Sequence, residues 1–313
     1  MANYGIMTRD AKDYRGRPRW PWVVLILLVL AGGVWLYLKR PSASVPGEEA
    51  PPEGDPETAS EVVATPAPPL SDEHRARLDE AFRLADDDAL VEARDALLAL
   101  LDNPGAAAAR KQIEERLGEI SIELLTTPRP MPGKVEYAIA AGDQIRSIAR
   151  KHGMTIELVC KANQLRNPDV IQVGDRLRLL DNPAFAIVVR KGANDLLLTM
   201  DGKFVKRYTV STGKYGRTPV GTFKITVKAV EPIWYIDGRQ IPYGDKENIL
   251  GTRWMAIEAT GDTMPASGYG IHGTWEPESL GRQSSAGCIR MSNSDVEELY
   301  LIVPEGTPVT IQE

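Results

Sequence analysis

The sequence has little of what disulfide frameworks and metal centres need. It holds two cysteines and three histidines among 313 residues, and neither an H-E-x-x-H nor a C-x-x-C spacing occurs. Two cysteines are too few for a disulfide framework, although an exported chain can still form one bridge. A zinc site normally needs at least three protein ligands. We therefore expect no metal centre.

Positive charge is also in short supply. The chain has 37 Lys and Arg residues against 43 Asp and Glu residues, which gives a formal net charge of -6 at pH 7. Apart from one cluster near the N-terminus, the basic residues are spread along the chain, whereas nucleic-acid-binding proteins gather them in a patch. No nucleic-acid partner is expected. The length and the apolar share of 43% are typical of two or three small globular domains.

One long hydrophobic run stands near the N-terminus. Residues 20–38 read WPWVVLILLVLAGGVWLYL without a charge, about the length that a helix needs to cross a bilayer. Five basic residues precede the run over 9–19, and only Lys39 and Arg40 follow it before the sequence turns acidic, so the positive-inside rule predicts a cytoplasmic tail over 1–19 and a transmembrane anchor over 20–38. A cleaved signal peptide is the alternative, but the run exceeds a typical signal core. We expect a single-pass protein of the inner membrane whose remainder faces the periplasm.

Composition separates a linker from a helical segment. Residues 41–70 carry eight prolines and six acidic residues without Lys or Arg, a composition that favours an extended linker. Residues 71–126 have apolar positions at helical spacing, with Ser71 as the predicted cap of the first helix and a break at Asn103-Pro104-Gly105. This segment is predicted to be a small packing or spacer bundle rather than a partner-binding repeat. A second Pro-rich break follows it over 126–134.

A compact strand-helix-helix-strand module is predicted over 135–181. It contains the pattern Y-x-I-x-x-G-D-x-x-x-x-I-A-x-x-x-G, an Asn163-x-Leu165 pair and a closing I-x-x-G-D-x-L. These motifs resemble a LysM domain. The resemblance implies binding of the N-acetylglucosamine-containing glycan strands of peptidoglycan. The implied groove runs along the loop after Gly142, where Asp143 stands, and along the loop from Asn163 to Ile171, which includes Leu165.

From residue 185 to 313 the pattern changes to short strands, which predicts a mainly β domain, a sandwich or partly closed barrel, with one helix near 295–302. Its only histidine, His272, stands sixteen positions before its only cysteine, Cys288. A thiol attacks a carbonyl as the thiolate and so needs a nearby base. The N–H groups of Gly287 and Cys288 are placed to meet a developing oxyanion. The pair by itself does not establish catalysis.

Two other chemistries fit the same segment poorly. One histidine and one cysteine are too few to hold a zinc ion. A serine nucleophile at Ser284 or Ser285 lacks the G-x-S-x-G turn that such a residue normally occupies.

Three stretches resemble the L,D-transpeptidase catalytic domain, also called the YkuD domain, over 185–313. They are STGKYGRTPVGTFKI, YGIHGT and S-x-G-C-I-R-M. The resemblance implies that Cys288 is the nucleophile, that His272 is the general base and that the backbone carbonyl of Gly273 orients the imidazole. Ser285 and Arg290 match flanking positions that shape the pocket or meet a substrate carboxylate.

One position departs from the family pattern. Many members carry a second histidine directly before the Gly-Cys pair, where this chain has Ala286. The departure leaves proton transfer to His272. It also follows that Cys288 must stay a free thiol, so we predict no bridge to Cys160, which we interpret as a core residue of a short helix.

The resemblance implies an L,D-transpeptidase that acts on peptidoglycan stem peptides through a thioester on Cys288, releases D-alanine and passes the acyl group to an amine. No cofactor is needed, because the free energy of the cleaved bond is kept in the acyl-enzyme. The same site can instead serve a carboxypeptidase, with water as acceptor, or an enzyme that attaches a protein lysine to the wall. A non-catalytic wall anchor is the alternative from another class.

Overall fold

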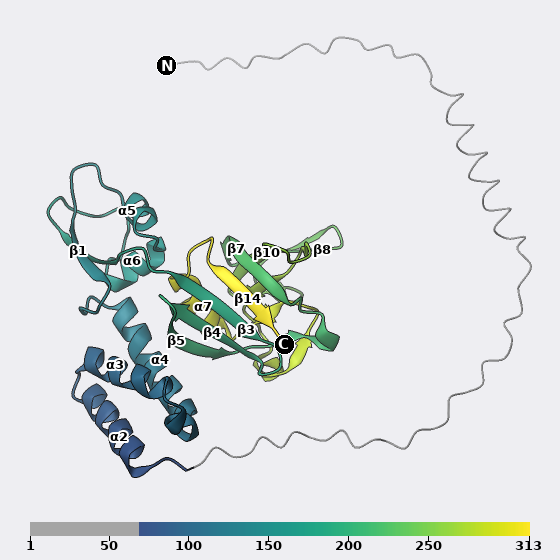
Figure 1. Cartoon of the computed structure of the whole chain (residues 1–313). Coiled ribbons are helices and arrows are strands. Elements are labelled where there is room, and N and C mark those ends of the chain that lie inside the picture. The colour runs from purple at the N-terminus through teal and green to yellow at the C-terminus, as the bar shows by residue number, and fades with distance from the viewer. Residues whose placement is uncertain (1–68) are drawn as a thin grey trace, which may run out of the picture. The chain divides into compact units, whose positions relative to one another are not determined.

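The computed structural model describes residues 69–313 (Figure 1). The predicted tail over 1–19, the predicted anchor over 20–38 and nearly all of the linker over 41–70 lie outside these residues. No helix of the described part has both the length and the apolar character needed to cross a bilayer.

The longest of these helices, α4 (Arg110–Thr126), has 17 residues and several charges, whereas a spanning helix needs about 20 mostly apolar ones. The finding contradicts the predicted fold class with a single transmembrane helix. The predicted single-pass location in the inner membrane is contradicted with it. The architecture that the structure supports is a mainly β domain accompanied by helices.

The helical segment begins where its capping residue predicts. Ser71 accepts a hydrogen bond from the His74 N–H and so caps α2 (Asp72–Asp86). Asn103 caps the next turn in the same way. Apolar faces are buried between neighbouring helices. The remaining elements of the segment are α3 (Leu90–Leu101), the short η1 (Pro104–Ala109) and α4.

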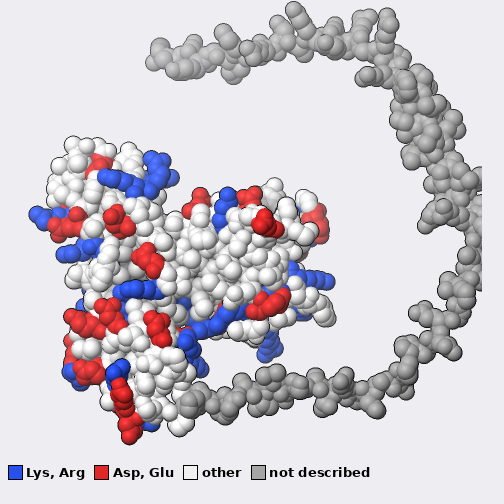
Figure 2. Space-filling model, viewed as in Figure 1, with Lys and Arg blue, Asp and Glu red and all other residues white. Residues whose placement is uncertain are grey.

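Helix α4 covers an edge of the C-terminal sheet. It packs against the edge strand β5 (Lys203–Thr209), and Gly118 allows the stem of Lys206 to approach closely. The buried Glu114 accepts two hydrogen bonds from Arg207, at 2.7 and 2.6 Å. A covered edge cannot pair with another chain. The helical segment is thus a packed part of the fold. Acidic and basic side chains lie interspersed over the face drawn in Figure 2.

The module over 134–180 has the order strand, helix, helix, strand. Strand β1 (Lys134–Ala138) pairs antiparallel with β2 (Arg176–Leu180), with Tyr137 opposite Leu177. Helices α5 (Ile145–Lys151) and α6 (Ile156–Ala162) bury their apolar sides against this pair. Cys160 lies on α6 and is half-buried, so its packing role is partial.

The C-terminal domain is built on one open sheet of eight strands rather than on the two packed sheets of a sandwich. The strand order is β13-β11-β10-β7-β14-β3-β4-β5. Most neighbours are antiparallel, but β14 with β3 and β11 with β13 are parallel. Helix α7 (Asn293–Ile302) packs against β10 and β11. The other strands are β3 (Phe185–Arg190), β4 (Asp195–Met200), β7 (Gly221–Val230), β10 (Arg253–Ala259), β11 (Gly270–His272), β13 (Ile289–Arg290) and β14 (Pro308–Gln312).

Two short strand pairs stand outside this sheet. Strand β6 (Thr212–Gly213) pairs parallel with β12 (Gln283–Ser285), and β8 (Trp234–Ile236) forms a hairpin with β9 (Arg239–Ile241). Short 3-10 turns η2 (Lys214–Gly216) and η3 (Pro277–Ser279) complete the loops.

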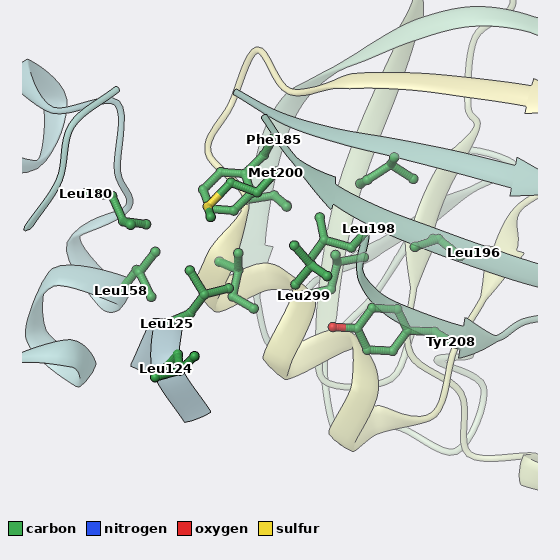
Figure 3. Packing of buried hydrophobic residues seen from close by; sticks show 14 of the residues in the cluster. Leu124, Leu125, Leu158, Leu180, Phe185, Leu196, Leu198, Met200, Tyr208 and Leu299 are labelled. Carbon is green, nitrogen blue, oxygen red and sulfur yellow. The ribbon is translucent and has the colours of Figure 1, made fainter. Parts of the chain in front are cut away.

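One hydrophobic cluster joins the three parts of the described chain. The buried side chains that meet in it come from α4, from the module over 134–180, from the sheet and from α7 (Figure 3). Those labelled in the figure include Leu125, Leu158, Leu198 and Leu299. The sheet alternation that predicts a buried face is clearest in β3, where every second residue is buried.

Candidate active site

Strand register brings the predicted catalytic residues to one face of the sheet. His272 on β11 lies opposite Trp254 on β10 and opposite Arg290 on β13. Residues that face each other across a ladder point to the same side of a sheet. Cys288 stands in the bend directly before β13, two positions before Arg290. All four residues line one cavity of about 420 Å³.

The walls of this cavity are mainly apolar. Strand β8 and neighbouring loop residues form one side, and Tyr269 and Trp254 form another. Arg290 is the one cationic side chain among the lining residues. The cavity is therefore a place where electrostatic interactions are strong, because little water competes for them. The residues of β8 and of the neighbouring loops that line it are Ile233, Trp234, Tyr235, Ile236, Ile249 and Leu250.

His272 is 1% exposed and is held by the backbone. Its Nδ1 lies 2.6 Å from the carbonyl oxygen of Gly273. A carbonyl can only accept, so Nδ1 carries the proton and Nε2 is left with a lone pair. Burial lowers the pKa of His272 to about 4, against the opposing effect of the Gly273 carbonyl, and the Arg290 charge lowers it further. The imidazole is therefore a neutral base at neutral pH.

The aromatic neighbour of His272 fixes its other face. The ring of Trp254 lies with its centroid 5.7 Å from that of the imidazole, at an interplanar angle of 32°. Gly270 makes room for the indole, because a Cβ there would lie 2.5 Å from the Trp254 ring. Sequence reasoning missed Trp254, since only the strand register places it opposite His272.

Cys288 is a free, partly buried thiol. Burial raises its pKa, while the backbone N–H of Gly270 and the charge of Arg290 act in the opposite direction. The Sγ atom lies 3.6 Å from the carbonyl oxygen of Gly268. With a raised thiol pKa and a lowered imidazole pKa, the cavity holds a protonated thiol and a neutral base at rest, so the thiol must lose its proton when it reacts. Cys160 is also free, as predicted.

The loop before Cys288 is held by Ser285. The Gly287 N–H donates to Ser285 Oγ at 3.0 Å, and that hydroxyl donates to the Cys288 carbonyl at 2.6 Å. Gly287 has a φ of +148°, and a Cβ would lie 2.7 Å from the Tyr269 ring, so only glycine fits. Two N–H groups were expected to meet an oxyanion. The N–H of Gly287 already donates to Ser285, so the N–H of Cys288 is the one that remains for the oxyanion.

Arg290 is tied at the cavity wall by a carboxylate. Its Nη1 lies 3.1 Å from Glu276 Oε2, and its side chain is 13% exposed. The positive charge disfavours the imidazolium of His272 and favours the thiolate of Cys288, so it lowers both pKa values.

Replacing Arg290 by Gln is expected to raise the pKa of Cys288, because a cation that stabilises the thiolate is removed. The pH dependence of Cys288 alkylation by iodoacetamide measures this without any substrate. We expect its midpoint to move to higher pH in Arg290→Gln. Arg282→Gln, which changes an exposed arginine of the same segment, is the matched control and should leave the midpoint in place. Identical profiles for both variants and the wild type would contradict the electrostatic role.

The two loops of the predicted glycan groove meet in one hollow, but Asn163 and Leu165 do not line it. Asp143, directly after Gly142, lines this hollow of about 310 Å³ together with Pro168, Asp169 and Ile171 of the second loop. Its carboxylate accepts hydrogen bonds from the Tyr137 hydroxyl and a backbone N–H. The Asn163 amide is instead turned inward, where it bonds to the backbone at Arg178 through both of its ends. Leu165 lines a different hollow, near Cys160.

Comparison with known proteins agrees with the motifs. A family model described as the L,D-transpeptidase catalytic domain matches residues 184–311, and a LysM domain model matches residues 137–179. The Bacillus subtilis protein named "Putative L,D-transpeptidase YqjB" is 41% identical over 128 residues, which cover 41% of this chain and 70% of that protein. A second Bacillus subtilis protein, named "Putative L,D-transpeptidase YkuD", is 33% identical over 181 residues, which cover 56% of this chain and 97% of that protein.

A solved structure also resembles part of this chain. An L,D-transpeptidase from Mycobacterium smegmatis is 25% identical, and the match covers 45% of this chain and 65% of that one with a TM-score of 0.32. The sequence matches are what confirm the resemblance found in the motifs, with the LysM match lying N-terminal to the catalytic one.

Proposed function

Because this chain belongs to the L,D-transpeptidase family, we propose that Cys288 and His272 carry out its reaction on the stem peptides of peptidoglycan. The observation that carries this proposal is the pairing in one cavity of a free thiol with a buried, neutral imidazole. The Gly273 carbonyl accepts from Nδ1 and so fixes the tautomer of that imidazole, in which Nε2 carries the lone pair that takes a proton.

The acylation step begins with proton transfer from Cys288 Sγ to His272 Nε2. The thiolate attacks the carbonyl carbon of the third stem residue, and the carbonyl oxygen becomes an oxyanion that the Cys288 N–H meets. When the tetrahedral intermediate collapses, the bond to the terminal D-alanine breaks. The imidazolium gives its proton to the leaving amine, so D-alanine departs and a thioester remains.

The second step repeats the chemistry with an incoming amine. The amine of a neighbouring stem attacks the thioester carbon while His272 accepts its proton. The carbon–sulfur bond breaks, and the proton returns to Sγ, which leaves a new amide between two stems. One amide is exchanged for another, so no nucleotide is consumed. Peptidoglycan is the partner of both domains in this proposal, with the LysM domain binding the glycan strands.

The products decide which acceptor is used. The purified full-length chain is incubated with isotope-labelled tetrapeptide muropeptides, and the products are separated and identified by mass. Cross-linked dimers together with free D-alanine are expected. Tripeptides alone would identify a carboxypeptidase, and conjugates to an added protein would identify an attachment enzyme. Wall binding without any D-alanine release would show the non-catalytic anchor instead.

A further inference from the structure

One buried hydroxyl connects two loops of the site that are distant in the sequence. Thr218 has no exposed surface. Its Oγ1 accepts a hydrogen bond from the Gly213 N–H at 2.7 Å and donates one to the carbonyl oxygen of Gly287, also at 2.7 Å. The hydroxyl therefore acts as both an acceptor and a donor towards the backbone. Thr218 belongs to the STGKYGRTPVGTFKI stretch, and no step of the reaction above gives it a part.

The carbonyl that Thr218 binds belongs to the peptide group in front of the nucleophile. That group comprises the Gly287 carbonyl and the Cys288 N–H, and in a planar trans peptide these two point in opposite directions. A carbonyl turned towards the buried Thr218 therefore turns the Cys288 N–H away from it. The free N–H of the site is thus aimed by a hydrogen bond on the opposite side of its own peptide plane.

The peptide plane needs such a restraint because of the residue before it. Gly287 has a φ of +148° and no side chain to hinder rotation. Ser285 bonds to the Gly287 N–H and to the Cys288 carbonyl, which belong to the two adjoining peptide groups. Thr218 is the side chain that bonds to the peptide group between them.

The packing leaves no space for a substitute. A Cβ at Gly213 would lie 2.7 Å from the Thr218 nitrogen and 2.9 Å from the Gly287 Cα, so the three backbones are in direct contact. Loss of the hydroxyl would leave the Gly287 carbonyl and the Gly213 N–H buried without this partner. A buried carbonyl in that position gains by rotating towards another donor or towards water.

We propose that Thr218 is the positioning residue of the oxyanion site: it orients the Gly287–Cys288 peptide so that the Cys288 N–H meets the oxygen on which charge develops. The inference rests on the proposed function, since it needs a carbonyl substrate that Cys288 attacks. It assigns a task in the reaction to a side chain that does not touch the reacting atoms.

The test compares acylation with alkylation of the same thiol. Removal of one oxyanion donor lowers kcat by about 10²–10³-fold, and a peptide that is misoriented part of the time should lose about 10–100-fold. We expect the full-length Thr218→Val variant to show that loss in carbapenem acylation and in kcat, with KM changed by less than about threefold. Alkylation of Cys288 by iodoacetamide forms no oxyanion and should stay within about twofold of wild type.

Three further variants separate positioning from folding. Thr218→Ser keeps the hydroxyl and should restore acylation to within about threefold. Thr307→Val removes a similarly buried threonine hydroxyl, which donates to the Pro304 carbonyl over 2.7 Å and does not line the cavity. This variant should leave acylation unchanged. If Thr218→Val does not fold, Thr218→Ala, which leaves room for a water, takes its place as the variant without a hydroxyl.

The outcomes are distinct. No acylation of the wild type would refute the proposed function itself. Acylation of the wild type with equal rates in Thr218→Val and Thr218→Ala would overturn this inference alone. An equal loss of alkylation and acylation would also overturn it, because Thr218 would then support the thiol or the fold rather than the oxyanion.

Discussion

Replacement of Cys288 by Ala is expected to abolish both the covalent adduct with a carbapenem and the turnover of tetrapeptide stems. The side chain supplies the atom that forms the thioester, and it is the one thiol among the residues that line the cavity. Removal of the nucleophile from a catalytic triad lowers kcat by roughly 10⁶-fold, so activity should fall to the background of the assay. Intact-protein mass spectrometry followed by peptide mapping measures the adduct and locates it.

The second cysteine provides the control for this experiment. Cys160 lies on α6 and lines a separate hollow. Burial raises the pKa of its thiol, and the nearby Glu157 raises it further, so little thiolate is present at neutral pH. Cys160→Ala should keep full adduct formation and turnover. A carbapenem adduct of wild-type yield in Cys288→Ala would place the nucleophile elsewhere and end the present assignment.

Local motifs carry the prediction of the reacting residues. The S-x-G-C-I-R-M and YGIHGT stretches point to Cys288 and His272 because both motifs are short and chemically specific, and both residues line one cavity. The capping serine at Ser71 and the turn at Asn103 were likewise readable, since a cap acts on residues two or three positions away. In motifs of this kind, the interacting residues lie close together in one stretch of chain.

Contacts between distant stretches could not be read in the same way. Thr218 bonds to a residue 69 positions further on, and Trp254 meets His272 through the register of β10 and β11. Register depends on the whole sheet and on its turns rather than on the residues of one strand. The docking of α4 on β5 through Glu114 and Arg207 is of the same kind, because these residues are 93 positions apart.

Asn163 illustrates a motif whose residue has another role available. The resemblance placed it beside a glycan groove, yet its amide joins the end of α6 to β2 from within. An amide has a donor and an acceptor and can satisfy buried backbone groups as readily as a sugar. The sequence does not specify which way such a side chain turns, because burial is decided by the packing of the surrounding elements.

Replacement of His272 by Gln should have the second largest effect, and its pH dependence is the sharper observation. A general base contributes about 10²–10⁴-fold, so the acylation rate by a carbapenem at pH 7 should fall within that range. In the wild type the imidazole pKa of about 4 means that the base form is present throughout the range above it, and the acid limb should lie well below the ordinary histidine value near 6.5.

The variant should behave differently, because only the fraction of Cys288 that is already thiolate can attack. Burial raises the pKa of this thiol, so the rate in His272→Gln should climb about tenfold for each pH unit through neutrality, where the wild-type rate is flat. His74→Gln, a change in the helical segment, should keep the wild-type profile. A flat profile in His272→Gln would mean that another group accepts the proton. An acid limb near pH 6.5 in the wild type would mean that His272 is hydrated and mobile rather than held, as here, in a closed apolar wall by the Gly273 carbonyl and the Trp254 ring.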